Sequence, residues 1–478
     1  MRRNWLQRGV GLLVLGTAAG AGVVVCSVAA ADRSAALTSP HRRVLFGLWR
    51  VLYNTEMPSM RTMVLAGVLA VVCAALVAMV EGRISTRYRR SANGLATPLA
   101  PQPVMASTYG QFAGAVTVTV LIPAHNEERS IGTTIMSLMT QSHPPDRVVV
   151  VADNCTDSTI DVAERAGVEV FESVGNRHKK AGALNQALRQ ILPAQGDNDV
   201  VMVMDADTVL DEGFLEAATA RFTDDRALMA VGGLFYGDEG EGILGQFQRN
   251  EYIRYARDIR RRRGRVFVLT GTASMFRPRA LRTVAARRGI SLPGEPGQVY
   301  DTAALTEDNE LTIAIKSLGG LMISPSDCTV VTEMMPTWRA LWAQRLRWQR
   351  GALENLGAYG ITPQTFRYWA QQLGIGYGVI ALAAYLLLST VTVLVAGGWI
   401  WLPFWLGLGA VFMVERVVTV WAGGWRARLL AMTLFPELFF ATFLAVVFVK
   451  GALDISLGRA ATWKHVARLG DHDTVLVN

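Results

Sequence analysis

The stretch Val200 to Asp207, which reads VVMVMDAD, constrains the possible folds of this chain most strongly. Five consecutive apolar residues bounded by polar ones are typical of a strand that is buried on both faces of a parallel sheet. In an open α/β fold, the residues after such a strand lie at the carboxyl edge of the sheet, where ligands bind. Here those residues are Asp205 and Asp207, whose carboxylates suit Mg²⁺ or Mn²⁺ carrying the phosphates of a nucleotide. An acidic loop after a core strand is the alternative that this stretch leaves open.

Short valine-rich segments recur along the middle of the chain. Three more strand candidates cover residues 116–123, 147–153 and 168–171. Helical stretches separate the strand candidates and cover residues 130–141, 158–166 and 180–192. Strands that alternate with helices of this length predict βαβ units and a parallel sheet. We therefore expect residues 115–335 to form an α/β domain with a parallel-rich sheet.

The composition indicates that this domain is attached to a membrane. Hydrophobic residues make up 51% of the 478 residues and charged residues 18%, which is too apolar for an ordinary soluble enzyme. Uncharged runs long enough to cross a bilayer cover residues 9–31, 63–80 and 368–414. The last run has 47 residues, enough for two crossings with a turn near Gly397-Gly398 or Pro403. For the first run, a cleaved signal peptide is the alternative.

Arginines after the second uncharged run set the expected orientation. Four of them lie between Arg83 and Arg90, so the positive-inside rule makes the region that follows cytoplasmic. A further apolar candidate, 429–449, is interrupted by Pro436 and Glu437. A full crossing there would put the basic tail residues Lys464, His465 and Arg468 outside, so we expect an even number of crossings, with this last segment partly interfacial or re-entrant. The net charge of +8 lies largely beside apolar segments, which favours membrane lipids over nucleic acid as a partner.

The predicted organisation is that of a multi-pass protein of the cell (inner or plasma) membrane with a cytoplasmic α/β domain. Its parts are two N-terminal transmembrane helices over 1–90, a linker over 91–114, the α/β domain over 115–335, interfacial amphipathic helices over 336–366, and C-terminal transmembrane or interfacial helices with a tail over 367–478. The basic run 257–265, RDIRRRRGR, is expected to be a solvated or lipid-facing helix end, with binding of an acidic polymer as the alternative. The four cysteines lack a CxxC pairing and are expected to be small buried hydrophobic residues.

Polar residues follow the first two strand candidates. Pro123, Asn126 and Glu127 come at the end of the first strand, and Asp153 ends the second. If the strands are parallel, these residues lie at the same sheet edge as the two aspartates described above. A carboxylate such as Asp153 can accept a hydrogen bond from the N–H group of a nucleotide base. Further on, Lys180 lies in a basic helix start, where an anion is favoured, although a solvated helix end is the alternative.

Two further motifs lie later in the chain. The first, Thr306-Glu307-Asp308, opens a helical stretch in which Thr306 is a candidate cap and acids in the first turn are ordinary. The second, QRLRW at 344–348, lies on an amphipathic run from Trp338 onward. Its alternative is an interfacial helix with Trp and Arg at the headgroup level. The ends of the first two strands, the basic helix start, TED and QRLRW are five pieces, and each has its own alternative explanation. Their occurrence together in this order makes these separate alternatives implausible.

Together, DAD at 205–207, TED at 306–308 and QRLRW, a QxxRW pattern, at 344–348 resemble the signature of membrane-integrated family-2 glycosyltransferases. This group includes the processive synthases of hyaluronan, chitin, cellulose and poly-N-acetylglucosamine. The resemblance covers residues 116–351 and implies a GT-A type nucleotide-diphospho-sugar transferase domain between N- and C-terminal transmembrane helices. It also implies metal-dependent, inverting transfer from a UDP-sugar donor to a growing glycan or lipid acceptor. Mg²⁺ or Mn²⁺ is the implied cofactor, and accessory secretion proteins are candidate partners.

The resemblance implies donor-side roles for several residues. Asp153 matches the aspartate that recognises the uracil, although the usual Asp-Asp pair is Ala152-Asp153 here. Asp205 matches the residue that holds the nucleotide diphosphate region and is a second candidate metal ligand, whereas Asp207 matches the metal ligand. Lys180 lies in the basic segment that faces the donor sugar. The other candidates for nucleotide binding are Pro123, Asn126, Glu127, Gln344, Arg347 and Trp348.

The resemblance implies catalytic and acceptor-side roles as well. Asp308 matches the general base, Glu307 lies beside it, and Arg347 would stabilise the leaving diphosphate. Trp348 belongs to the motif that lines the acceptor site, and Gly271-Thr272-Ala273 occupies the place of an acceptor-side loop. A processive polysaccharide synthase is the first hypothesis, and a non-processive membrane enzyme that makes a glycolipid is the second. A non-catalytic assembly or secretion partner is the third, and the intact acids argue against it.

Overall fold

The structure is a computed structural model that describes residues 65, 68, 72, 116–262, 264–396 and 403–459. The uncharged run 9–31 and the linker 91–114 lie outside these residues, as does the run 63–80 apart from three positions. The chain divides into two compact units, one of residues 1–89 and 384–412 and the other of residues 90–383 and 413–478. All the candidate site residues belong to the second unit, which is described below.

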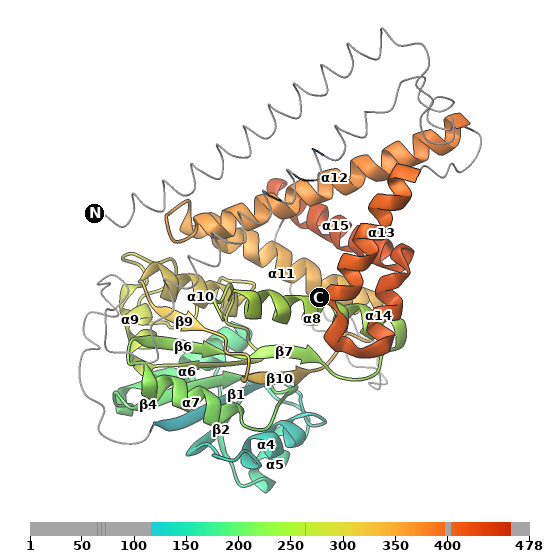
Figure 1. Cartoon of the computed structure of the whole chain (residues 1–478). Helices are drawn as coiled ribbons and strands as arrows, with labels where there is room; N and C mark the ends of the chain where they lie inside the picture. Colours follow the sequence, from blue (N-terminus) through green and yellow to red (C-terminus); the bar gives the residue numbers. More distant parts are fainter. Residues whose placement is uncertain are drawn as a thin grey trace, which may run out of the picture. The chain divides into compact units, whose positions relative to one another are not determined.

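A seven-stranded sheet lies at the centre of the second unit, in the order β3-β2-β1-β4-β8-β6-β9 (Figure 1). The strands are β1 (Thr117–Ala124), β2 (Arg147–Ala152), β3 (Glu169–Glu172), β4 (Asp199–Met204), β6 (Leu228–Gly232), β8 (Ala273–Phe276) and β9 (Leu321–Ile323). Strands β3, β2, β1 and β4 are mutually parallel, as are β6 and β9, whereas β8 runs antiparallel to both β4 and β6. The predicted parallel-rich sheet is confirmed, and the four predicted strands agree with the structure to within one residue at each end.

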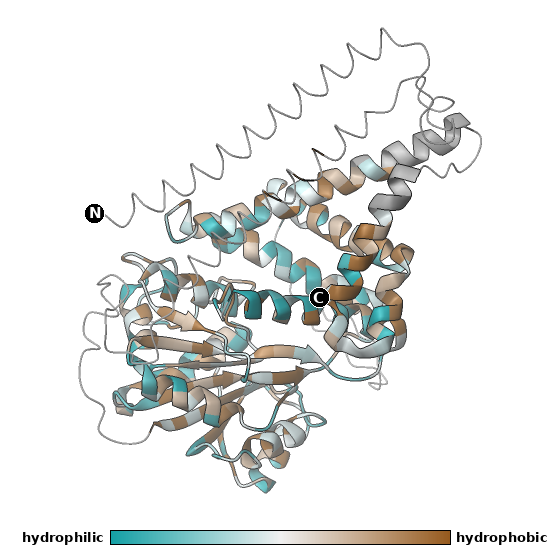
Figure 2. Ribbon diagram, viewed as in Figure 1, coloured by the Kyte–Doolittle hydropathy of each residue, from teal (hydrophilic) through white to brown (hydrophobic). Residues whose placement is uncertain are grey.

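Helices cover both faces of this sheet, which explains the continuous apolar run in β4. Val201 and Val203 face the core formed with α6 (Lys179–Ile191), α9 (Pro278–Arg287) and α10 (Glu307–Ser317). The alternate residues Val200, Met202 and Met204 face the core formed with α4 (Ile131–Met139), α5 (Thr159–Arg165) and α7 (Phe214–Asp224). Because side chains of a strand alternate between faces, a strand between two helical layers must be apolar throughout. Figure 2 shows the hydrophobic colour along these strands.

A smaller three-stranded sheet adjoins the carboxyl end of β4. Its order is β5-β10-β7, with β5 (Thr208–Leu210), β10 (Thr329–Thr332) and β7 (Leu234–Gly237). The short connection from β4 to β5 contains Asp205, Ala206 and Asp207, so the two acids lie where the chain passes from one sheet to the other. The long helix α8 (Gly242–Arg261) follows β7.

The C-terminal part of the chain is helical. It contains α11 (Trp338–Tyr359), α12 (Phe366–Ala396), α13 (Pro403–Thr419), the short η3 (Trp421–Gly423), α14 (Gly424–Met432) and α15 (Leu434–Ser456). The boundary between α12 and α13 falls where the sequence predicts a turn. Within the described part of the chain, α15 is the one helix whose length and composition would allow it to cross a membrane.

Pro436 and Glu437 interrupt the last apolar segment in the sequence but do not break its helix. The helix breaks earlier, at Thr433, and Pro436 lies in the first turn of α15, where a backbone N–H has no helical partner to lose. Glu437 is buried and accepts a hydrogen bond of 2.7 Å from Arg254 of α8, with Arg416 at 3.8 Å. The glutamate therefore faces neighbouring helices, as an acid in an apolar helix is expected to do.

Candidate active site

The acids after β4 lie beside the start of α6 and the loop before β8. Asp205 donates its backbone N–H to the carbonyl of Thr272 at 3.2 Å, and its carboxylate forms an ion pair with Lys180. Gly271 lies against this ion pair, because a Cβ at Gly271 would stand 3.0 Å from Lys180 Nζ and 3.3 Å from Asp205 Oδ2. The predicted acceptor-side loop therefore touches the predicted donor-binding acids.

Lys180 connects the DAD motif to the TED motif. Its Nζ, besides pairing with Asp205, lies 3.6 Å from Oε1 of Glu307. Burial acts to lower the pKa of Lys180, but the two carboxylates outweigh burial and raise it well above its usual value. The ammonium group is therefore charged throughout the physiological range and neutralises part of the acidic site when no donor is bound.

Asp308 lies in the first turn of α10 and faces the same loop. Its Oδ2 accepts a hydrogen bond of 3.1 Å from the backbone N–H of Gly271, and its Oδ1 accepts one of 2.7 Å from the N–H of Asn309. Burial first, and then the charge of Glu307, raise the pKa of Asp308 to about 6, against the opposing effect of Lys180. A carboxylate with such a pKa is suited to accept a proton near neutral pH.

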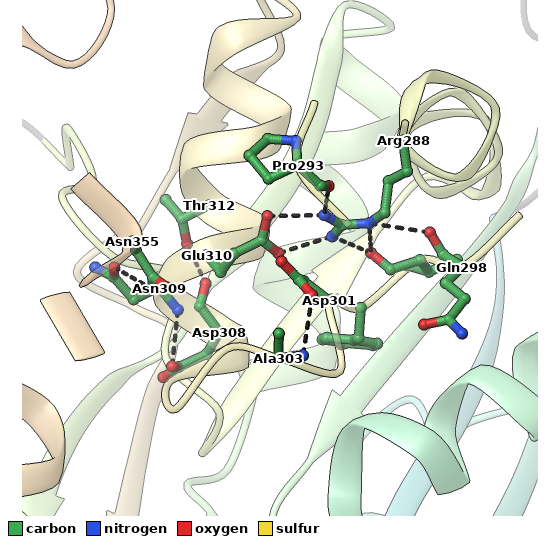
Figure 3. Close-up of polar contacts among 12 residues, drawn as sticks. Arg288, Pro293, Gln298, Asp301, Ala303, Asp308, Asn309, Glu310, Thr312 and Asn355 are labelled. Atoms are coloured by element: carbon green, nitrogen blue, oxygen red, sulfur yellow. Dashed lines mark hydrogen bonds and ion pairs between the residues drawn. The ribbon is translucent and has the colours of Figure 1, made fainter. Parts of the chain in front are cut away.

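Thr306 does not act as the predicted side-chain cap of α10. Instead, its carbonyl and Oγ1 each accept a hydrogen bond of 3.2 Å from Nδ2 of Asn355 on α11. The same amide group donates to Asn309 Oδ1 at 3.0 Å (Figure 3). The two helices approach closely at Gly351, where a Cβ would lie 2.5 Å from Thr306 Oγ1. Tertiary hydrogen bonding to α11 has thus replaced local capping.

A buried ion pair fixes the helix that carries Asp308, and sequence reasoning missed it. The Arg288 guanidinium has no solvent exposure and donates to both carboxylate oxygens of Glu310, at 2.8 and 2.7 Å. It also donates to the carbonyls of Pro293, Gln298 and Val299, as Figure 3 shows in part. Tyr359 of α11 donates its hydroxyl to Glu310. No local motif marks Arg288, because its partner lies 22 residues away in the chain.

The QRLRW motif lies on α11, and its second residue, Arg345, contacts both α8 and two other residues of the motif. Arg345 is buried and donates to Glu251 of α8 at 2.8 Å and to the side-chain oxygen of Gln344. Its Cζ lies 4.3 Å from the centroid of the Trp348 ring and 5.7 Å from that of Tyr252. Arg345 therefore holds the predicted nucleotide-binding residues Gln344 and Trp348 in place, although the sequence analysis gave it no role.

Arg347 acts on the same site through its charge. Burial and then the charge of Arg347 lower the pKa of Lys179, and the same charge counteracts the upward shift at Asp308. Arg347 on α11 therefore lies close enough to the start of α6 and to the TED motif to act on both. A cation of the QRLRW motif therefore acts electrostatically on the predicted general base.

The residues predicted to recognise the nucleotide base lie at the carboxyl ends of the adjoining strands β1 and β2. Asp153 is buried, and its Oδ1 accepts hydrogen bonds from Asn154 at 3.0 Å, Ser173 at 2.6 Å and Asn176 at 2.8 Å. Because these donors all use one oxygen, they orient the carboxylate. Pro123 is half-buried and pairs with Val151 in the sheet, one strand away from β4.

Asn126 and Glu127 use their side chains to hold neighbouring loops. Asn126 has a positive φ of 58° and accepts a hydrogen bond of 2.8 Å from the backbone N–H of Thr156. Glu127 accepts one of 2.8 Å from the hydroxyl of Ser130, and its backbone N–H donates to Thr159. Both residues lie at the predicted edge, but the interactions that the structure shows there are structural.

A small cavity lies between the acids and the loop before β8. Its lining includes Lys180, Gly271, Glu307 and Asp308 together with the buried Tyr300. Burial raises the pKa of Tyr300, so its hydroxyl is neutral and can donate a hydrogen bond. The sequence offered no signal for Tyr300, which lies outside every motif.

The acid pair suits a divalent metal that arrives with a nucleotide. In the described part of the chain, no group of three or more His, Cys, Asp or Glu side chains is placed to hold a metal by itself. Mg²⁺ is commonly held by one or two carboxylates, with water and substrate phosphates completing its octahedron. Asp205 and Asp207 fit this arrangement because they are two half-buried carboxylates one residue apart at the sheet edge.

A parallel-rich mixed sheet with an Asp-Ala-Asp turn after β4 and an acidic helix start beside it defines a GT-A type glycosyltransferase domain. Residues 115–351 match the model of the family described as "Glycosyltransferase like family 2", so this part of the chain is a family-2 glycosyltransferase domain. The matched region contains the sheet, the DAD and TED motifs and the QRLRW motif. The predicted family is therefore confirmed.

Relatives with curated names share this region. The chain is 31% identical over 250 residues to "Probable glycosyltransferase YdaM" of Bacillus subtilis (strain 168), an alignment that covers 49% of this chain and 54% of that protein. It is 26% identical over 246 residues to poly-beta-1,6-N-acetyl-D-glucosamine synthase of Staphylococcus aureus (strain COL), covering 50% and 55% respectively. The chain thus spans about half the length of the curated relatives it matches.

Solved structures with a similar fold include two complexes. One is the mannosyltransferase PcManGT from Pyrobaculum calidifontis in complex with GDP-Man and Mn²⁺, with a TM-score of 0.49 and 20% identity over 82% of this chain and 98% of that one. Another is glucosyl-3-phosphoglycerate synthase from Mycobacterium tuberculosis in complex with Mn²⁺, UDP and phosphoglyceric acid. Its TM-score is 0.33, with 20% identity over 54% of this chain and 82% of that one.

Proposed function

We propose that this chain is an inverting glycosyltransferase that uses a UDP-sugar to extend a β-linked polysaccharide at the cytoplasmic face of a membrane and passes the product through its own helices. The observation that supports it most directly is the position of Gly271. Its backbone N–H binds Asp308, and its Cα faces the Lys180–Asp205 ion pair. The DAD motif, which would bind the donor, and the TED motif, which would supply the general base, therefore both contact Gly271.

On the donor side, Asp153 would accept a hydrogen bond from the uracil, and Asp205 would lie beside the diphosphate. Asp207, together with Asp205, would hold Mg²⁺ or Mn²⁺, which when bound supplies positive charge to the diphosphate oxygens. Lys180 and Arg347 would add fixed positive charge on the same side. In a site shielded from water, such preorganised charges stabilise a leaving group more strongly than they would in water.

On the acceptor side, Asp308 would take the proton of the attacking hydroxyl group. The acceptor oxygen then forms a bond to the anomeric carbon while the bond from that carbon to the phosphate oxygen breaks, and UDP leaves with the electron pair. Attack from the face opposite the phosphate inverts the donor's α-linkage into a β-linkage. General base catalysis of this kind contributes roughly 10²- to 10⁴-fold to the rate. Trp348 would offer a flat apolar surface to the acceptor sugar.

Product size separates this proposal from its alternative, a non-processive enzyme that makes a glycolipid. The match to a poly-beta-1,6-N-acetyl-D-glucosamine synthase favours polymer formation and makes UDP-N-acetylglucosamine the first donor to try. The full chain, reconstituted in lipid nanodiscs with Mg²⁺ or Mn²⁺, is incubated with a panel of radiolabelled UDP-sugars, and the products are sized. Long polymers support the proposal, whereas one or two sugars on lipid support the alternative.

The control in this experiment is Asp308→Asn, which keeps the shape of the side chain but cannot accept the proton. We expect this variant to lose transfer while still binding UDP, measured by calorimetry. Wild-type turnover in Asp308→Asn would remove the assignment of the base. Absence of transfer from every donor by the wild-type chain would instead favour the third hypothesis, a non-catalytic partner.

A further inference from the structure

A buried polar contact joins the helix that begins at the TED motif to the helix that carries QRLRW. Asn355 lies on α11, beyond Trp348, and is only 4% exposed. Its amide group donates to the carbonyl and Oγ1 of Thr306, both at 3.2 Å, and to Oδ1 of Asn309 at 3.0 Å. Thr306 and Asn309 lie on either side of Asp308 in the chain. One side chain of α11 therefore holds both flanks of the predicted base.

The two helices are in close contact on both sides of Asn355. One turn before it, a Cβ at Gly351 would lie 2.5 Å from Oγ1 and 2.8 Å from Cγ2 of Thr306. One turn after it, Tyr359 donates its hydroxyl to Glu310. Positions 351, 355 and 359 are four residues apart and so share one face of α11. This face fits the beginning of α10 and leaves little room for the two helices to shift.

The loop before β8 also binds the beginning of α10. The backbone N–H of Gly271 donates to the carboxylate of Asp308 at 3.1 Å. The carbonyl of Asp308 accepts a hydrogen bond of 2.7 Å from Oγ1 of Thr312, which itself accepts one of 2.9 Å from the backbone N–H of Leu269. Two amide groups of this loop are therefore bound to α10, so their protection from solvent exchange depends on where Asp308 lies.

The chemistry of Asn355 suits a role in position and not in charge. The acceptors of its amide group are a carbonyl, a hydroxyl and an amide oxygen, none of which belongs to the carboxylate of Asp308. A cation in its place would favour the ionised form of Asp308 and make it a weaker base. The neutral amide instead fastens the chain on both sides of Asp308 without adding a charge beside it.

We propose that Asn355 is a positioning residue, which holds Asp308 in place relative to the QRLRW motif by fastening the first turn of α10 to α11. A base and the groups that stabilise the leaving diphosphate must surround the same sugar, and a displacement of about 1 Å can cost about 10²-fold in rate. That Asp308 is the base rests on the proposed function. The effect of Asn355 on the position of Asp308 can be measured without any sugar transfer.

The first measurement is hydrogen–deuterium exchange of the full chain in detergent, followed by mass spectrometry over residues 269–271. Asn355→Leu keeps the approximate size of the side chain but removes its donor group. We expect exchange over residues 269–271 to become roughly fivefold faster or more, the effect of losing about one hydrogen bond. Amide groups of the central strand β1 should exchange as in the wild type, because the change is local.

Two further variants test whether the effect belongs to this contact. Gly351→Ala leaves Asn355 in place, but its added Cβ would push α11 away from Thr306 and should speed exchange over residues 269–271 in the same way. The matched control is Asn250→Leu, which removes another buried asparagine, one that donates to the carbonyl of Ala427 at 3.4 Å. This variant should leave exchange over residues 269–271 at the wild-type rate.

Sugar transfer by the same variants links the position of Asp308 to the reaction. With a donor that the wild-type chain uses, Asn355→Leu should lower kcat by roughly tenfold or more and change KM for the donor by a smaller factor. Asn355→Gln keeps the amide group and should recover part of the rate. A contact that only stabilised the fold would lower Tm and leave kcat of the folded enzyme unchanged.

Three results would overturn the proposal. Wild-type exchange over residues 269–271 in Asn355→Leu would show that Asn355 does not hold Asp308 in place. Equally fast exchange in Asn250→Leu, or in β1 of Asn355→Leu, would show a general loss of stability. An unchanged kcat in a variant with faster exchange would show that this contact does not serve the reaction. If the wild-type chain transfers no sugar, the proposed function fails, and the exchange rates alone decide whether Asn355 positions Asp308.

Discussion

Asp308 combines burial with two hydrogen bonds from backbone N–H groups, and its environment sets the pH at which it can act as a base. Desolvation and the neighbouring Glu307 raise its pKa to about 6. The ionised form, which accepts the proton, therefore predominates above this pH and is lost below it. A carboxyl group with an ordinary pKa of about 4 would remain ionised well below pH 6.

This leads to a prediction about pH dependence. In the wild-type chain, kcat/KM should fall about tenfold for each pH unit below an apparent pKa near 6, because kcat/KM reports the ionisation of the free enzyme. Glu307→Gln removes the neighbouring negative charge and should move this acid limb to lower pH. An acid limb near pH 4 in the wild type, or one that stays in place in the variant, would contradict the electrostatic account of Asp308.

At the scale of secondary-structure elements, the pair Arg288–Glu310 joins the end of α9 to the helix that carries Asp308. Removing one member of a buried ion pair leaves the other charge unpaired, at a cost of about 3–5 kcal/mol. We therefore expect Arg288→Met to lower Tm by roughly 6 °C or more. The measurement is thermal unfolding of the full chain in detergent.

The neighbouring arginine supplies the control for this prediction. Arg287 is exposed, so Arg287→Met should leave Tm nearly unchanged. The double variant Arg288→Met/Glu310→Met should be more stable than Arg288→Met, since apolar replacements of a whole buried pair are often tolerated. Equal stability of the single and double variants would show that Arg288 acts through its packing or its carbonyl contacts and not through the ion pair.

The elements differ in how well the sequence predicts them. Strands β1, β2 and β4 were predictable because two helical layers require unbroken apolar runs, and the acids that follow them were predictable because parallel strands share one carboxyl edge. The antiparallel strand β8 was not predicted, since its sequence ASMF lacks the valine-rich pattern of the predicted strands. Arg288 is one of five arginines between positions 277 and 288, and only the fold shows that Arg277 and Arg288 are the two buried ones.

Helix α11 gives a prediction about the QRLRW motif. Arg345 connects α11 to Glu251 of α8 and packs against the Trp348 ring. Arg345→Met should therefore lower kcat by about 10²-fold and weaken UDP binding by a smaller factor, because Gln344 and Trp348 are both misplaced. Arg345→Lys should recover part of the rate, and the exposed Arg339→Met on the same helix should have no effect. A loss of UDP affinity equal to the loss of kcat would instead indicate that Arg345 binds the donor.

At the scale of the whole molecule, α15 packs along α11 over most of its length. Near the start of α11, the Trp338 ring contacts Phe439 and Phe443, at 5.5 and 5.2 Å between centroids. Near its middle, Arg350 donates to the carbonyl of Arg459 at 2.5 Å, beyond the end of α15. Both helices therefore run side by side in the same direction. An apolar helix whose two ends touch the same catalytic-domain helix is expected to lie at the membrane surface and not to cross it.

This arrangement predicts that the C-terminal tail lies on the same side of the membrane as the catalytic domain. A fluorescent protein fused after Asn478 should fluoresce in the cytoplasm, whereas alkaline phosphatase fused at the same point should be inactive. As a matched control, alkaline phosphatase inserted after position 400, in the predicted turn between two crossings, should be active because that turn is expected outside. Active phosphatase at the C-terminus would show that α15 crosses the bilayer, and its contacts with α11 would then have to break in the membrane.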